Sequence, residues 1–327
     1  MSTGSGTRAI IAALLANLGI ALTKFIAYLI TNSASMLAES VHSVADSGNQ
    51  ALLLLGGKRA QRGASAEHPF GYGRDRYIYA FIVSIVLFSL GGLFALWEGF
   101  QKLANPHPIE RAWVALGVLI IAIVLESISF RTAIVESNRI RGTASWVNFI
   151  RRAKAPELPV VLLEDFGALI GLVFALMGVS LAVVTGDSVW DAIGSLAIGS
   201  LLVSIAIVLA TETKSLLVGE AATRADLQKI EAALLAEPEV RSIIHMRTMH
   251  LGPDELLVAV KIAVDRAITA ADLAAAIDRA EARIRAAVPI ARVIYIEPDI
   301  RRATTEPAPD WSSDQQPSPA AEPASGS

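Results

Sequence analysis

The chain has 327 residues, of which 53% are hydrophobic and 18% are charged, and its formal net charge is −3 at pH 7. Charges make up about a quarter of an average soluble domain, so this composition argues against an ordinary soluble enzyme and against disorder of the whole chain. The small net charge provides no basic field for nucleic acid, and we expect no nucleic-acid partner. The sequence contains no cysteine. Any bound transition metal therefore needs His, Asp or Glu ligands.

The hydrophobic residues gather in the first two thirds of the chain, in runs of roughly 20 residues, the length that crosses about 30 Å of hydrocarbon. The sequence predicts six transmembrane helices, at residues 9–30, 34–55, 78–97, 113–130, 159–184 and 190–210. The first run is too long for the core of a cleavable signal peptide, and we expect it to remain as a membrane helix. These runs predict a multi-pass integral protein of the lipid bilayer.

Lysine and arginine predict the orientation, because cytoplasmic loops carry the excess of both residues. They are concentrated in two loops, between the second and third spans and between the fourth and fifth, at Lys58, Arg59, Arg62, Arg74, Arg76, Arg131, Arg139, Arg141, Arg151, Arg152 and Lys154. The opposite side has little beyond Lys102 and Arg111. We therefore expect a bacterial inner membrane with both termini in the cytoplasm.

A small soluble module follows the last span. Residues 223–236 and 269–286 have the pattern of amphipathic helices, and each begins with a capping box in which Thr223 faces Asp226 and Thr269 faces Asp272. Three segments have the pattern of strands, at residues 240–250, 255–265 and 292–297. The order α-β-β-α-β predicts a two-layer α/β domain.

These patterns divide the chain into three parts. We expect a six-helix transmembrane domain at residues 1–213, a cytoplasmic α/β domain at residues 214–302 and a disordered tail at residues 303–327. The tail is rich in Pro, Ala, Ser and Glu and has almost no large aliphatic side chains with which to form a core.

The second span contains three ionisable residues with helical spacing. Glu39, His42 and Asp46 fall within an arc of roughly 60° on one helix face. Such groups are costly inside a membrane, so an ionisable cluster there indicates a functional site, and histidine with carboxylates is a divalent-metal ligand set. The alternative is a solvated helix start near the surface. Asp46, however, is 14 residues beyond Asn32, or about 21 Å along a helix.

The fifth span contains Glu164 and Asp165 in an otherwise apolar run. Neighbouring residues on a helix point about 100° apart, so the two carboxylates cannot face one ion equally. We expect one of them to bind the ion, and the other to pair with a cation such as Lys24 or to take part in proton transfer. Four other polar residues at membrane depth are expected to form hydrogen bonds between helices: Asn17, Asn49, Glu126 and Asp191. Glu126 and Asp191 could also line an aqueous path.

Six spans, a cytoplasmic α/β module, the second-span sequence SASMLAESVHSVAD and the following HPFGYGRDRY resemble the cation diffusion facilitator family over residues 8–299. The resemblance implies export of zinc or a related divalent ion in exchange for protons. It also implies a homodimer whose cytoplasmic domains have a ferredoxin-like metallochaperone fold.

In the family pattern the second and fifth spans each supply two metal ligands four residues apart. Here these positions are His42 and Asp46, then Val161 and Asp165, so the usual fifth-span histidine is missing. Glu164, Glu39 or water would have to supply the fourth ligand. The sequences LLED and HPFGYG are similar to the branch that contains the animal mitochondrial zinc transporter, in which that histidine is also absent.

Two further sites of the family are incomplete in this chain. In the loop after the second span His68 matches a ligand, but the next histidine position is Tyr72. In the cytoplasmic domain His245 matches a ligand, but two other positions are Lys261 and Tyr295. Glu297 and His250 could still bind weakly. We expect no complete binuclear site in that domain.

The sequence thus predicts a transporter of divalent metal ions and most directly a proton-coupled zinc exporter, in which zinc is the substrate and protons are the counter-ion. Two alternatives stay open: selectivity for manganese, iron or cobalt, and a membrane-anchored metal sensor or scaffold. Hydrolase motifs such as HExxH are absent, and so we expect neither an enzyme nor a bound cofactor.

Overall fold

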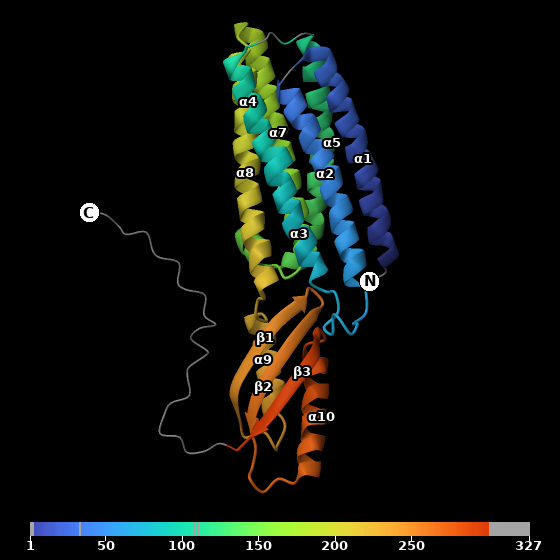
Figure 1. Ribbon diagram of the computed structural model, residues 1–327, viewed down its shortest axis with the longest axis vertical. Helices are drawn as coiled ribbons and strands as arrows, with labels where there is room; N and C mark the ends of the chain where they lie inside the picture. The colour runs from blue at the N-terminus through green and yellow to red at the C-terminus, as the bar shows by residue number, and fades with distance from the viewer. Residues whose placement is uncertain (1–2, 33, 107–108, 110, 301–327) are drawn as a thin grey trace, which may run out of the picture. The chain divides into compact units, whose positions relative to one another are not determined.

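The computed structural model describes residues 3–32, 34–106, 109 and 111–300, and the expected disordered tail at residues 303–327 lies outside the described residues. The chain divides into two compact units, Met1–Val218 and Gly219–Ser327. The first is helical and the second is a small α/β unit (Figure 1).

Long helices that run side by side make up most of the helical unit (Figure 1). Its elements are α1 (Thr3–Thr31), α2 (Ala34–Ala60), α3 (Asp75–Val86), the π-helix η1 (Leu87–Leu93), α4 (Phe94–Ala104), α5 (Ala112–Arg141), the short α6 (Trp146–Arg152), α7 (Glu157–Thr185) and α8 (Val189–Val218). Residues with positive φ follow α1 and α7, at Asn32 (φ 53°) and Gly186 (φ 71°). Such left-handed residues commonly end helices.

Among the described residues of this unit, four segments are long and apolar enough to cross a membrane: Asp75–Ala104, Ala112–Arg141, Glu157–Thr185 and Val189–Val218. The first combines α3, η1 and α4. The predicted third to sixth spans are thus supported, whereas the total of six is not confirmed. In α2 the polar residues around Glu39, His42 and Asp46, together with the basic last turn, lower the hydropathy of a helix that is 27 residues long.

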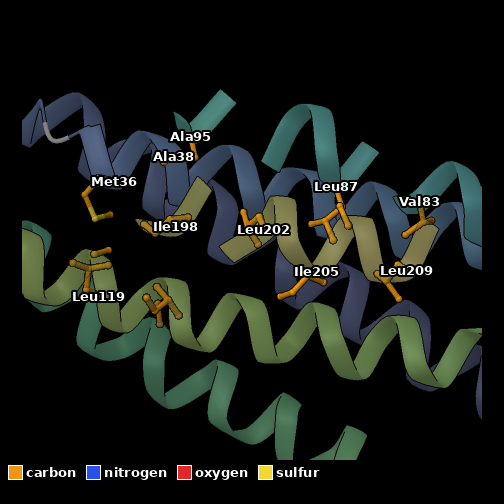
Figure 2. Packing of buried hydrophobic residues seen from close by; sticks show 14 of the residues in the cluster. Met36, Ala38, Val83, Leu87, Ala95, Leu119, Ile198, Leu202, Ile205 and Leu209 are labelled. Carbon is orange, nitrogen blue, oxygen red and sulfur yellow. The ribbon is translucent and has the colours of Figure 1, made fainter. Parts of the chain in front are cut away.

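Helix α2 contacts α1, α3, α7 and α8, and α5 contacts α1 and α7. One cluster of buried aliphatic side chains joins these helices; among its members in Figure 2 are Met36 of α2, Leu119 of α5 and Ile198 of α8. The polar face of α2 is therefore enclosed by neighbouring helices.

Glycines bring the η1–α4 segment and α8 into close contact. A Cβ atom at Gly199 would lie 2.7 Å from the backbone nitrogen of Leu96 and 2.9 Å from the carbonyl oxygen of Gly92. A Cβ atom at Gly92 would lie 2.6 Å from Val203 of α8. Small residues at such crossings allow helix backbones to approach closely, as in other membrane bundles.

The α/β unit contains α9 (Arg224–Leu235), β1 (Ser242–Gly252), β2 (Glu255–Ala263), α10 (Ala270–Ala287) and β3 (Ala291–Asp299). The strand order is β1-β2-β3, with β1 antiparallel to β2 and β2 parallel to β3. Alternate residues of β2 are buried, from Leu256 to Ile262, and they share a core with both helices. The predicted order α-β-β-α-β is confirmed.

Thr223 and Thr269 cap their helices as predicted, and each pairs with the expected aspartate through its hydroxyl. The Oγ1 atoms of Thr223 and Thr269 accept hydrogen bonds of 3.2 Å from the backbone N–H groups of Asp226 and Asp272, respectively. Each threonine hydroxyl in turn donates to the aspartate carboxylate, at 2.7 Å and 2.6 Å. These contacts satisfy donors that the first turn of a helix leaves without partners.

The close approach of the η1–α4 segment to α8 can be tested with Gly199→Ala. Because the added methyl group would collide with backbone atoms, we expect a loss of about 1–3 kcal/mol of stability, measured as a lower midpoint of thermal unfolding in detergent. Gly117→Ala is the matched control, since nothing lies within 4 Å of a Cβ there. Equal midpoints for the two variants would contradict the packing described.

Candidate metal centre

Three ionisable residues of α2 lie inside the helical unit. Glu39 and His42 are completely buried, and Asp46 is 5% exposed. They are therefore not on a solvated helix start, and each needs a partner within the protein to offset the loss of hydration.

Glu39 has a basic partner on α1. The Lys24 Nζ lies 3.0 Å from the Glu39 Oε2 and donates a second hydrogen bond, of 2.8 Å, to the Ser43 Oγ. Lys24 is itself completely buried. Of the two roles expected for the second carboxylate of the fifth span, a pair with Lys24 is not found, because the ion pair of Lys24 joins α1 to α2.

The two carboxyl groups of α7 have different surroundings. The Asn49 Nδ2 donates to the Glu164 Oε1 at 2.5 Å, and the Glu164 carboxyl also lies within hydrogen-bond reach of Asp46. The Asp165 Oδ2 instead accepts a hydrogen bond of 3.0 Å from the Ser129 Oγ of α5. Thus α2 meets α7 at Asp46 and Glu164, and two carboxyl groups this close require a proton or a cation between them.

His42 lies beside Asp46 and against η1. Its Nδ1 is 3.4 Å from the Asp46 Oδ1, and a Cβ atom at Gly91 would be 3.7 Å from the same nitrogen. Neither ring nitrogen has a hydrogen-bond partner among the described residues. A buried imidazole whose ring nitrogens make no hydrogen bonds has a nitrogen available to bind a cation.

Glu126 of α5 belongs to the same group of charges, although its sequence signal is weak. It is 5% exposed and interacts electrostatically with Asp46, Glu164 and Asp165. Asp191 is buried in the first turn of α8, where its electrostatic neighbours include Glu98 and Lys102.

We define the intramembrane cluster as the buried ionisable residues that interact at this place: Lys24, Glu39, His42, Asp46, Glu126, Glu164 and Asp165. In the described part of the chain, no three His, Asp or Glu side chains are already arranged to hold a metal ion. The helices thus gather the donor groups, and binding requires rotation of side chains or movement of a helix.

The candidate ligands of the loop after α2 and of the α/β unit contact other side chains or backbone atoms of the protein. In the loop after α2 the ring of His68 stacks against Tyr72, with centroids 4.5 Å apart. In the sheet His245, Lys261 and Glu297 are register partners across β1, β2 and β3. His250 is buried, and its Nδ1 lies 3.3 Å from the carbonyl oxygen of Gly252.

Lys261 provides a positive charge on the central strand, opposite His245 of β1 and Glu297 of β3. Its Nζ lies 3.0 Å from the Glu297 Oε1 and 3.1 Å from the Asp299 Oδ2. Hydrogen bonds to Glu297 and Asp299 raise the pKa of Lys261 above its ordinary value. Both carboxylates therefore have a positively charged partner without a metal.

Comparison with protein families gives two matches. Residues 10–218 match the cation efflux transmembrane domain, and residues 222–299 match the cation efflux protein, cytoplasmic domain. A solved structure of the MamM-CTD is 23% identical and covers 24% of this chain and 93% of its own, with a TM-score of 0.23. That score is too low to add to the description of the fold.

Three relatives illustrate the similarity. The mitochondrial proton-coupled zinc antiporter SLC30A9 of Xenopus laevis is 33% identical over 70% of this chain and 41% of its own length. Metal tolerance protein C4 of Arabidopsis thaliana is 31% identical over 75% of this chain and 54% of its own. The cation-efflux pump FieF of Klebsiella pneumoniae is 27% identical over 77% of this chain and 79% of its own. The chain thus spans about two fifths of the length of the antiporter.

The contacts of Lys261 predict that the sheet binds no zinc. In full-length protein carrying Asp46→Asn and Asp165→Asn, we expect equilibrium dialysis to find less than about 0.2 zinc per chain. Adding Lys261→His should raise the bound zinc to about one per chain, because the new imidazole provides a third ligand beside His245 and Glu297. Lys229→His, on the exposed face of α9, is the control. The prediction would be refuted if the Asp46→Asn, Asp165→Asn protein, with Lys261 intact and no zinc bound at α2, bound about one zinc per chain.

Proposed function

This chain belongs to the cation efflux family, and we propose that it carries divalent metal ions, zinc in particular, through the membrane in exchange for protons. The intramembrane cluster carries the proposal, because one histidine and several carboxylates are buried together among long apolar helices. Relatives named as a zinc antiporter and as a cation-efflux pump support it. These names describe transporters, which favours transport over an enzymatic role.

We propose that α1 and α2 also cross the membrane, for a total of six spans. At 1.5 Å per residue, the 27 residues of α2 extend about 40 Å, which exceeds the hydrocarbon thickness. The positions of lysine and arginine support cytoplasmic termini. The match of residues 222–299 to a cytoplasmic domain of this family supports the same orientation and a homodimer.

The proposed zinc ligands are His42, Asp46 and Asp165, with Glu164 as the fourth. Glu164 is favoured over Glu39 because it lies within hydrogen-bond reach of Asp46, whereas Glu39 is paired with Lys24. One imidazole with carboxylates suits tetrahedral zinc. A set this rich in oxygen also suits manganese or iron, which makes a transporter for those ions the second candidate.

Exchange follows from the chemistry of these ligands. Imidazole and carboxylate groups bind a metal in their deprotonated forms, so metal affinity falls as they are protonated. Rearrangement of the helices would expose the ligands to one side of the membrane and then to the other, as in transporters with a site near the bilayer midplane. A sensor or scaffold would bind the metal without moving it.

Loss of the proposed ligands should abolish transport. In vesicles that contain a zinc-sensitive dye, we expect Asp46→Asn and Asp165→Asn each to lower zinc flux about 10- to 100-fold, because each removes a charged ligand. Glu136→Gln, which changes an exposed carboxylate of α5 paired with Arg139, should leave flux unchanged. Wild-type flux in both aspartate variants, with the proteins still folded, would refute transport through this site.

Proton coupling can be tested by reversing the pH gradient. With protons more concentrated on the side that receives zinc, we expect a several-fold faster zinc flux than with no gradient, because protons displace zinc on release. Reversal of the gradient should slow the flux, and a protonophore should remove the difference. Equal flux under all three gradients would point to uncoupled transport, and zinc binding without any flux would favour a sensor.

A further inference from the structure

A completely buried lysine lies next to the proposed zinc ligands, and none of the proposed steps uses it. Lys24 of α1 faces the same side of α2 as His42 and Asp46, and it interacts electrostatically with both of them and with Glu126. A buried ammonium group requires a partner that replaces its hydration. Lys24 has two, the Glu39 carboxylate at 3.0 Å and the Ser43 hydroxyl at 2.8 Å.

The carboxylate of Glu39 is held on both sides. Its Oε2 is bound by Lys24, and its Oε1 lies against Gly171 of α7, where a Cβ atom would be only 2.8 Å away. Among the described residues this Oε1 has no hydrogen-bond partner. Glu39 is thus an acceptor that could still bind a cation, but its ion pair is made with α1.

We propose that Lys24 determines metal specificity by holding Glu39 in an ion pair and thereby excluding this carboxylate from the coordination shell of the transported ion. The proposal rests on the proposed function. It limits the ligands to His42, Asp46, Glu164 and Asp165, and it makes Lys24 a positioning residue that does not itself contact the metal.

The ion pair matters because ligand composition determines which metals bind well. Adding a fifth group, the Glu39 carboxylate, would enlarge the coordination number and increase the share of oxygen ligands, which favours manganese over tetrahedral zinc. The opposite change, neutralising Glu39 alone, would leave the charge of Lys24 uncompensated near the site and would repel any divalent cation. The two single substitutions therefore have different expected effects.

The experiment is a double-mutant cycle with full-length protein in vesicles, in which zinc and manganese fluxes are measured separately. We expect Lys24→Met to raise the manganese-to-zinc ratio about tenfold, because Glu39 becomes available as a ligand. Glu39→Gln should lower the flux of both metals about tenfold at subsaturating concentration and leave their ratio unchanged. The double variant should return the ratio to within about threefold of wild type, since both charges are gone.

Other outcomes would overturn the proposal. If Glu39 is itself a ligand, the double variant will lose zinc flux as Glu39→Gln does. If the pair only stabilises the fold, the variants will lower thermal stability while the metal ratio stays at the wild-type value. If Lys24→Met fails to fold, comparison of the double variant with Glu39→Gln still tests the proposal. The proposal requires a higher zinc flux in the double variant than in Glu39→Gln.

Failure of the proposed function would give different results. Either the wild-type protein would show no zinc flux, or Asp46→Asn would show wild-type zinc flux, whether or not Lys24 is substituted. In that case zinc and manganese competition, measured by dialysis of the detergent-solubilised protein, still tests Lys24. An unchanged ratio of affinities in Lys24→Met would reject the proposed role of the ion pair.

Discussion

The cost of burying charge inside a bundle of apolar helices constrains the rest of this structure. Ionisable groups at such depth persist only when they are paired, hydrogen-bonded or able to bind an ion. Lys24 with Glu39 joins α1 to α2, Asn49 with Glu164 joins α2 to α7, and Ser129 with Asp165 joins α5 to α7. The polar contacts that satisfy the cluster are thus also the contacts that determine how the helices pack around it.

The charged residues of the α/β unit are paired on an accessible face of the sheet. There the Lys261 ammonium group pairs with Glu297 and Asp299. In both units a lysine pairs with carboxylates, but inside the helical unit it leaves His42, Asp46, Glu164 and Asp165 for a cation. We therefore propose that the metal binds in the helical unit and not on the sheet.

Features with local causes could be predicted from the sequence, and features that depend on helix packing could not. The helix caps at Thr223 and Thr269 and the α-β-β-α-β order follow from short-range patterns, and the structure contains them. The shared face of Glu39, His42 and Asp46 follows from helical spacing. The partner of Lys24 does not, since it depends on the rotation of α1 against α2, and helix α6 and the π-helix beside His42 carry no clear sequence signal.

We propose that a single histidine and a set of carboxylates inside the membrane bind the transported ion. X-ray absorption at the zinc edge of full-length, zinc-loaded protein tests it most directly, because imidazole and carboxylate ligands scatter differently. We expect a four-coordinate ion with one imidazole and otherwise oxygen ligands, and loss of the imidazole signal in His42→Gln. Two or more imidazoles per zinc, or an imidazole signal that survives His42→Gln, would contradict this account.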